Sequence, residues 1–352
     1  MVVILIGFLI LEISSRFLFK DEFKNYDRRV MLYSEDSTFK NFKDIFFYKK
    51  NSSFKSMAIY KDKLSNEFIK EYEYDLRSNN SGLIQSQDII KNKKSIFILG
   101  ASETKGQGSK PWFYDLEKYN TQENIQFVNI GMIGTGPSQQ NKLFRKIKDE
   151  YSLKVDKIII IFSRGYFSRA VWNFNDQQLR CLKKQDSCIG TESIYGFNFK
   201  NSDPFIFAGN IINSRMNNLN SFSESIKSGN YFQALKEIAK KSYFIKKLYL
   251  VFKIYEANNL QSENNYNTLI NLKNEFSDKL YLIHMMSKEE AKNNSLSESS
   301  MVTLKKLKEN KLMKNYHFCK IPHNGFHKND SHANKIGYTF LRKCVERLLN
   351  EK

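Results

Sequence analysis

From residue 95 onward, short and almost wholly apolar runs alternate with longer amphipathic stretches, and this alternation restricts the fold more than any other feature of the chain. Each apolar run is bounded by charged residues or glycine, which is typical of strands buried on both faces of a parallel sheet. Helices between consecutive strands imply right-handed βαβ crossovers, so the sequence predicts an α/β fold with a five-stranded parallel sheet. The predicted strands are Ser95–Leu99, Gln126–Ile130, Lys157–Phe162, Lys279–His284 and Tyr316–Ile321.

Two other segments have the spacing of amphipathic helices. In the segment that begins at Ser138, the apolar residues Leu143, Ile147 and Tyr151 recur every four residues, and Ser138 is the expected N-cap. The C-terminal helix, 334–349, also has one apolar face. The residues of that face are Leu341, Cys344, Val345, Leu348 and Leu349.

The regularity breaks between about 165 and 275, where the chain is polar and rich in Asn and Ser, with a helical pattern in part. This stretch is too long for an ordinary connection in a compact domain, so we expect a largely helical insertion that acts as a lid or subdomain. The predicted organisation is an N-terminal anchor or signal-like segment at 1–19, a membrane-proximal connector with lead-in strands at 20–94, and the α/β domain at 95–352.

The N-terminal segment is apolar for ten residues and then carries Glu12. An uncleaved signal anchor, a cleavable signal peptide and a buried helix all fit this pattern. The lack of a basic n-region and of a small-residue cleavage site disfavours cleavage. Basic residues on the C-terminal side, such as Arg16 and Lys20, argue against export under the positive-inside rule. We nevertheless expect a membrane anchor in a bacterial cell envelope, with the α/β domain outside the cytoplasm.

The four cysteines show no zinc-binding spacing. Cys181 and Cys188 bracket a short loop that a disulfide could close in an oxidising compartment, which slightly favours export. Cys319 and Cys344 lie in apolar patterns and are expected to be buried thiols. The histidines His323 and His327 are four residues apart, but no helix is predicted there, so neither a metal nor a cofactor is expected.

The net charge of +19 would suit a polyanion or an anionic membrane surface as partner. Lys is scattered through every segment, however, and no compact basic stripe is interleaved with stacking aromatic residues. Nucleic acid is therefore not the expected partner; if it were, affinity for polyanions would depend strongly on salt.

In open parallel sheets, ligands bind beyond the carboxyl ends of the strands, so the residues that follow each strand are the candidates for chemistry. The first strand leads into Gly100-Ala101-Ser102, and the second into NIGMIGTGP, 129–137, whose glycines can bring backbone N–H groups close to a ligand. The third leads into SRGYFSR. After the fifth strand a loop reaches NDSHANKIGY, 329–338.

Ser102 needs a base, because a serine has almost no nucleophilic character at neutral pH on its own. Asp330 and His332 are two residues apart, a spacing at which the carboxylate can hold the imidazole Nδ1–H and leave Nε2 free. Ser102 and His332 are expected at the same edge of the sheet. The sequence therefore predicts a Ser102–His332–Asp330 triad, with the backbone N–H groups of Ser102 and Gly131 as the oxyanion hole.

Each of these motifs alone is weak, and only their conjunction carries the prediction. A serine after a strand is usually an N-cap, and many Asp-x-His pairs are solvated loop residues. Ser102 also lacks the second glycine of a G-x-S-x-G elbow, and no G-K-[ST] follows it, so neither an α/β-hydrolase elbow nor a P-loop fits.

The order of the blocks resembles the SGNH, or GDSL-type, hydrolase family. ILGASETKGQG resembles its first block, NIGMIGTGPSQ its second and DSHANKIGY its last, and NNSGLI at 79–84 resembles a lead-in of membrane-anchored bacterial members. The resemblance covers roughly 79–352. It implies a three-layer, flavodoxin-like domain in which Ser102 is the nucleophile, Gly131 offers an oxyanion N–H, and Asp330 and His332 complete the triad.

The sequence departs from the family pattern at three places. Ala101 replaces the aspartate before the nucleophile, and the last block reads Asp-x-His where many members have Asp-x-x-His. The family asparagine after the third strand is missing, and Tyr166 lies at about that position. Loss of one oxyanion donor costs about 10²–10³ in rate, so Tyr166, or else Ser163 or Arg164, is the expected substitute.

The sequence thus predicts a serine esterase or O-acyl (acetyl) transferase that acts on an acyl ester of a cell-surface glycan or lipid. Water as the acceptor would give hydrolysis, and a sugar hydroxyl would give transfer; the sequence leaves this choice and the oligomeric state open. The alternative is a catalytically degenerate SGNH-like protein that binds glycan or serves as an envelope scaffold, and the missing asparagine motivates it.

Overall fold

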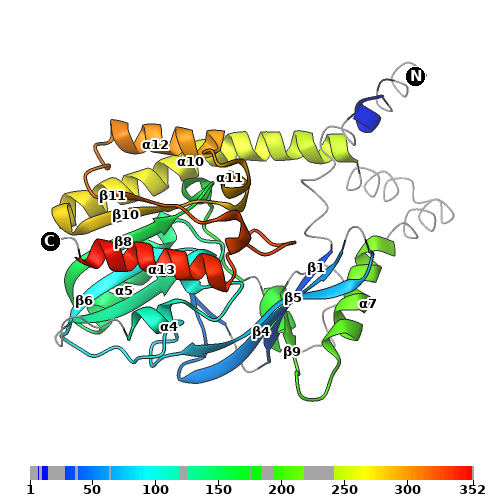
Figure 1. Ribbon diagram of the computed structural model, residues 1–352, viewed down its shortest axis with the longest axis horizontal. Helices are drawn as coiled ribbons and strands as arrows, with labels where there is room; N and C mark the ends of the chain where they lie inside the picture. The colour runs from blue at the N-terminus through cyan, green and yellow to red at the C-terminus, as the bar shows by residue number, and fades with distance from the viewer. Residues whose placement is uncertain are drawn as a thin grey trace.

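The computed structural model describes residues 7, 10–14, 28–35, 39–62, 65–118, 125–174, 176–183, 194–217 and 242–350. Figure 1 shows two β-sheets and, along one flank, the long helix α10 (Tyr243–Phe276). Within the described ranges, no helix has both the length and the apolar character needed to cross a membrane. Most of the predicted N-terminal anchor lies outside these ranges.

The larger sheet has five strands, all parallel, which confirms the α/β class and the predicted sheet. The strands are β6 (Lys94–Gly100), β7 (Ile125–Gly131), β8 (Lys154–Phe162), β10 (Leu280–Met285) and β11 (Tyr316–Cys319). Across the sheet their order is β11-β10-β8-β6-β7. Numbered by their own succession along the chain, this is the doubly wound order 2-1-3-4-5, with its topological switch point between β6 and β8.

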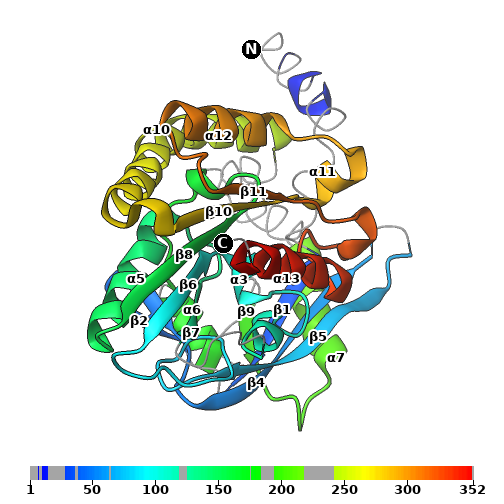
Figure 2. The same ribbon diagram turned by 60° about the vertical axis from the view of Figure 1, so that its left-hand side comes forward.

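Helices cover both faces of this sheet (Figure 2). In β6, Phe97 and Leu99 pack on the side of helix α5 (Pro137–Glu150), whereas Ile96 and Ile98 pack on the side of helix α13 (Lys335–Asn350). Because side chains alternate between the two faces and both faces are buried, the strands read as continuous apolar runs.

Helix α5 begins one residue before the predicted N-cap. Its first residue is Pro137 and Gly136 occupies the N-cap position, so the prediction of Ser138 as N-cap is wrong. Proline is favoured in the first helical turn, because the N–H that it lacks would have no helical partner there. The backbone N–H of Ser138 instead donates to Oδ1 of Asn265 in α10, at 3.0 Å.

The second sheet is mixed, with the order β5-β4-β1-β9. Its strands are β1 (Arg29–Ser34), β4 (Ser52–Lys61), β5 (Phe68–Ser78) and β9 (Ile194–Phe197). The first three come from the region predicted as a connector and pair antiparallel, whereas β9 comes from the insertion and pairs parallel with β1. A hairpin of β2 (Lys40–Phe42) and β3 (Ile45–Phe47) lies between β1 and β4 in the chain.

The described part of the insertion is largely helical, and helices also connect and follow the last strands. Within the insertion lie η1 (Tyr166–Ser168), α6 (Asp176–Lys183), α7 (Pro204–Asn217) and most of α10. Elsewhere lie α3 (Ser102–Lys105), α4 (Phe113–Leu116), η3 (Ser277–Lys279), α11 (Lys288–Asn293), α12 (Glu298–Glu309) and η4 (His323–Gly325).

Cys319 at the end of β11 and Cys344 in α13 form a disulfide, so the prediction of two buried thiols is wrong. Their apolar surroundings correctly indicated burial of Cys319, but a linear pattern does not show which cysteines face each other across two packed elements. Cys181 is also disulfide-bonded. Its predicted partner, Cys188, lies outside the described residues.

Candidate active site

Ser102 is the first residue of helix α3 and follows β6 directly, at the switch point of the parallel sheet. Gly100 permits this sharp strand-to-helix turn, because a Cβ at that position would lie 1.8 Å from Oγ1 of Thr104. Ser102 is only 7% exposed, so its hydroxyl lies in a nearly enclosed site at the carboxyl edge of the sheet.

The structure brings together the three residues of the predicted triad. Oγ of Ser102 lies 3.0 Å from Nε2 of His332, a residue 230 positions later in the chain. Nδ1 of the same imidazole lies 2.6 Å from Oδ1 of Asp330, and the backbone N–H of His332 donates to that oxygen at 3.1 Å. Asp330 thus holds His332 in place through two contacts, one to the ring and one to the backbone N–H.

Three side chains of the mixed sheet contact the other oxygen of Asp330. The hydroxyls of Tyr60 and Tyr72 donate to Oδ2 at 2.8 and 3.1 Å, and the guanidinium of Arg29 lies 3.7 Å from it. Burial opposes ionisation of Asp330, but His332, Arg29 and Tyr60 together hold its pKa well below the usual range. The carboxylate is therefore ionised at neutral pH.

Sequence reasoning missed these three residues, although one local signal marks β5. Tyr72, Tyr74 and Leu76 are buried and alternate with the less buried Glu73 and Asp75. This period of two is typical of a strand with one buried face. It predicts which way Tyr72 points, but not that Asp330 lies there.

A second carboxylate, also missed by sequence reasoning, contacts the hydroxyl of Ser102. The Ser102 hydroxyl donates to Oε2 of Glu103 at 3.3 Å. The other oxygen, Oε1, accepts from the Ser163 hydroxyl at 3.1 Å and lies 3.8 Å from the Arg169 guanidinium. Burial raises the pKa of Glu103, but Arg169 and His332 outweigh it and bring that pKa below its usual value.

Gly131 lies beside helix α3, which carries Ser102, but the backbone N–H of Gly131 already has a hydrogen-bond partner. A Cβ at Gly131 would lie 2.5 Å from the backbone nitrogen of Lys105 in α3, so only glycine permits this close approach. The N–H predicted for the oxyanion hole donates to Oδ1 of Asn129 at 2.8 Å. The amide of Asn129 is in turn fixed by its Nδ2, which donates to the carbonyl of Ile84 at 2.7 Å.

The predicted substitutes for the family asparagine are also engaged. Tyr166 is buried and its hydroxyl donates to Oε1 of Gln140. Arg164 forms an ion pair with Glu289, and the hydroxyl of Ser163 donates to the second carboxylate described above. The backbone N–H of Ser102, as the first of helix α3, has no partner within that helix.

The two histidines considered for a metal site, His323 and His327, have different surroundings. His323 is exposed in η4, whereas Nε2 of His327 lies 2.6 Å from the carbonyl oxygen of Gly108. The ring of His327 also packs against Tyr72, with ring centroids 5.1 Å apart. One imidazole is therefore exposed to solvent, whereas the other is held against Gly108 and Tyr72.

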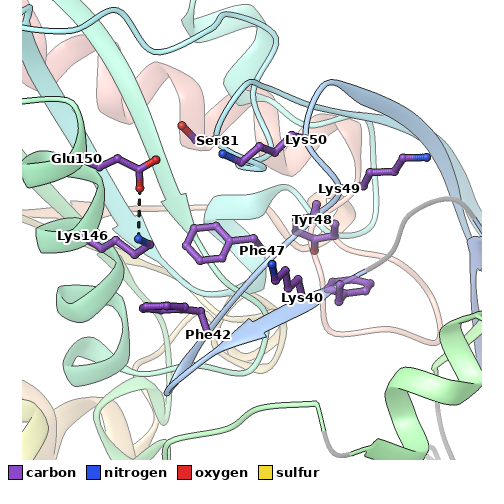
Figure 3. Close-up of a pocket in the computed structure, with 10 residues that line it drawn as sticks. Lys40, Phe42, Phe47, Tyr48, Lys49, Lys50, Ser81, Lys146 and Glu150 are labelled. Carbon is purple, nitrogen blue, oxygen red and sulfur yellow. Dashed lines mark ion pairs between the residues drawn. The ribbon is translucent and has the colours of Figure 1, made fainter.

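Two cavities adjoin the site and a third lies elsewhere. One of about 780 Å³ is lined in part by Tyr72 and His327, and one of about 600 Å³ lies next to Arg164. Figure 3 shows the third, of about 680 Å³, between the β2–β3 hairpin and α5. Aromatic side chains and lysines line it, Lys146 pairs with Glu150 at 3.3 Å, and no triad residue takes part.

No protein-family model matches the chain, and no curated protein matches it. The chemistry must therefore be inferred from the geometry of Ser102, His332, Asp330 and Glu103.

Proposed function

We propose that the protein is an SGNH-type serine esterase or O-acyltransferase that works through an acyl-serine intermediate. The observation that carries this proposal is the continuous chain of hydrogen-bond distances from Oγ of Ser102 through the imidazole of His332 to the buried carboxylate of Asp330. Such a chain supplies the base that a serine lacks on its own.

In the first step, Oγ of Ser102 attacks the carbonyl carbon of an ester while Nε2 of His332 takes the hydroxyl proton. Asp330 accepts the Nδ1–H and stabilises the imidazolium that forms. The bond to the leaving oxygen then breaks, and Nε2 gives its proton to that oxygen. The acyl group stays on Ser102 until water or a second hydroxyl attacks it, which regenerates the free serine.

The topology of the parallel sheet supports this proposal. Its strand order is that of doubly wound, flavodoxin-like sheets, and the nucleophile follows the first of its strands at the switch point. His332 follows the last strand and precedes helix α13. This order of blocks along the chain is the one on which the resemblance to SGNH hydrolases rests.

We further propose that the catalytic domain is anchored to a bacterial membrane and lies outside the cytoplasm, where its substrate is an acyl ester, such as an acetyl ester, of a cell-surface glycan or lipid. The Cys319–Cys344 disulfide supports this location, because structural disulfides persist mainly in oxidising compartments. Residues 1–10 form an apolar run of the length found in signal-type segments, which supports the proposed anchor.

A catalytically degenerate protein that binds glycan or serves as a scaffold is the second candidate. Two observations favour it: the N–H of Gly131 donates to Asn129, and the hydroxyl of Tyr166 donates to Gln140. If no donor replaces them when substrate binds, the negative charge of the tetrahedral intermediate is poorly stabilised, and each lost donor costs about 10²–10³ in rate.

Labelling with a fluorophosphonate distinguishes the two candidates. The wild-type protein is expected to be labelled, Ser102→Ala to give no label, and His332→Ala to react at least about 10³-fold more slowly. Ser168→Ala, which removes an exposed hydroxyl after β8, should be labelled like the wild type. A folded wild-type protein that takes no label would contradict the enzyme proposal and favour the binding protein.

A further inference from the structure

Glu103 gives the nucleophile a second acceptor for its single hydroxyl proton. Oγ of Ser102 lies 3.0 Å from Nε2 of His332 and 3.3 Å from Oε2 of Glu103. A serine hydroxyl has one proton, so it can donate to only one of these acceptors at a time. The reacting oxygen is thus flanked by a base and by a carboxylate.

Contacts to the rest of the residue hold Glu103 in this position. Its Oε1 accepts from Ser163 at 3.1 Å and lies 3.8 Å from Arg169, whose Nη1 donates to the carbonyl of Thr135 at 3.4 Å. Its backbone carbonyl accepts from the indole N–H of Trp112 at 3.0 Å. Because these partners use the other oxygens, Oε2 stays directed at the nucleophile.

Acylation changes what surrounds Oε2. Once Oγ of Ser102 carries an acyl group, it has no proton, so Oε2 of Glu103 loses the hydrogen bond that Ser102 donates. The loss of a donor to a carboxylate is unfavourable in a site as enclosed as this one. A molecule that enters beside the acyl group is therefore favoured if it can donate a hydrogen bond to Oε2 while it also donates to Nε2 of His332.

Water meets both requirements and an alcohol does not. Water has two O–H groups and can donate one to Nε2 and the other to Oε2, whereas an alcohol has a single O–H, which must go to Nε2 if it is to react. We propose that Glu103 is a catalytic residue that selects water as the acceptor, which makes hydrolysis rather than transfer the outcome at this site. This inference rests on the proposed acyl-serine chemistry.

The deacylation step follows directly. The water oxygen bonds to the acyl carbon, its first proton passes to Nε2 of His332, and its second stays hydrogen-bonded to Oε2 of Glu103. The bond between the acyl carbon and Oγ of Ser102 then breaks, Nε2 returns its proton to Oγ, and the carboxylic acid leaves. Oε2 regains the serine hydroxyl as donor.

Partitioning of the acyl group between water and an alcohol tests the inference. The protein is given p-nitrophenyl acetate in the presence of 1-propanol, and acetate and propyl acetate are both quantified. In Glu103→Ala, acetate formation should fall about tenfold, the worth of a hydrogen bond to a charged group, while propyl acetate formation falls less. The ratio of propyl acetate to acetate should therefore rise. Glu103→Gln keeps an acceptor oxygen and should give an intermediate ratio.

Two measurements keep a failure of this inference separate from a failure of the proposed function. Glu309→Ala removes an exposed carboxylate at the end of α12 and should leave the product ratio unchanged. Fluorophosphonate labelling of each variant reports whether Ser102 and His332 are still assembled. No labelling of the wild type would refute the acyl-serine proposal; labelling of all variants with an unchanged ratio in Glu103→Ala would refute only the selection of water.

Discussion

Lys105, on the same short helix as Ser102, is fully buried, and none of the described carboxylates pairs with it. Its Nζ donates to the hydroxyl of Tyr33 at 2.8 Å and lies 4.8 and 5.2 Å from the rings of Tyr33 and Tyr48. Aromatic faces stabilise a cation only partly, and burial lowers the pKa of Lys105 to about 7. The amine is therefore partly neutral near physiological pH.

We predict that Lys105 makes the protein more stable as the pH rises from about 7 to about 10. In the unfolded chain the pKa of lysine is about 10.4, so between the two values the unfolded state binds more protons than the folded state. The free energy of unfolding should increase by up to about 1.4 kcal/mol per pH unit in this range. Lys105→Met should remove this slope and raise the free energy of unfolding near pH 7 by roughly 2–4 kcal/mol. Urea unfolding between pH 6 and 10 measures both.

The control for this prediction is Lys110→Met, which removes an exposed lysine of the same loop region. Its curve of unfolding free energy against pH should run parallel to that of the wild type. If Lys105→Met also ran parallel to the wild type, the amine of Lys105 would have an ordinary pKa in the folded protein.

At the scale of elements, the mixed sheet completes the site on the parallel sheet. Each of β1, β4 and β5 provides one side chain to Asp330, namely Arg29, Tyr60 and Tyr72. Asp330 itself lies in the loop before α13, so the triad depends on the docking of three strands that precede Asp330 by more than two hundred residues in the chain.

We predict that Tyr72→Phe lowers kcat/KM for an ester about tenfold. The change removes a donor to Oδ2 of Asp330, and a hydrogen bond to a charged group contributes about 1.5–3 kcal/mol. The carboxylate then orients His332 less well. Steady-state hydrolysis of p-nitrophenyl acetate measures the effect, and Tyr60→Phe should behave in the same way.

Tyr74→Phe is the matched control for this pair. Tyr74 is buried two residues farther along the same face of β5, but the hydroxyls that donate to Asp330 are those of Tyr60 and Tyr72, not that of Tyr74. The kcat/KM of Tyr74→Phe should stay within about twofold of the wild type, because the change removes no hydrogen bond to the triad. Equal losses in Tyr72→Phe and Tyr74→Phe would mean that packing, rather than the bond to Asp330, sets the rate.

The two sheets differ in how far the sequence predicts them. The parallel strands are predictable because burial on both faces leaves an apolar run in each, as in Lys94–Gly100. The mixed sheet depends on pairings between distant segments, above all that of β1 with β9. Local residue patterns do not predict such pairings, because these depend on tertiary contacts.

At the scale of the whole molecule, the triad and the groups around it also differ in how far the sequence predicts them. Ser102, Asp330 and His332 are predictable because the proposed chemistry requires particular residue types after the first and last parallel strands. Glu103 and the engaged N–H of Gly131 are not, since their roles depend on which groups the fold places within hydrogen-bond distance. Sequence patterns thus locate the residues of the triad, whereas the structure shows which neighbouring groups accept hydrogen bonds from Ser102 and Gly131.

The Cys319–Cys344 disulfide connects the last strand to the last helix, and so ties the end of the chain to the parallel sheet that carries the triad. We predict that, without reductant, the free energy of unfolding of the double variant Cys319→Ala/Cys344→Ala is about 3 kcal/mol lower than that of the wild type. The reason is that the bond joins residues 25 positions apart and restricts the unfolded chain accordingly. Urea unfolding of both proteins measures the difference, and adding a reductant to the double variant isolates the contribution of the bond at Cys181.

The redox state of these cysteines in cells also tests the proposed location of the whole molecule. Protein alkylated at the moment of lysis should contain Cys319 and Cys344 as a disulfide if the domain lies in an oxidising compartment. Mass spectrometry of the alkylated peptides reads this directly, and the same protein left to oxidise in air before alkylation shows whether the two thiols can pair at all. Alkylated thiols in the first sample and a disulfide in the second would place the domain in a reducing compartment, because the fold allows the bond and the cell prevents it.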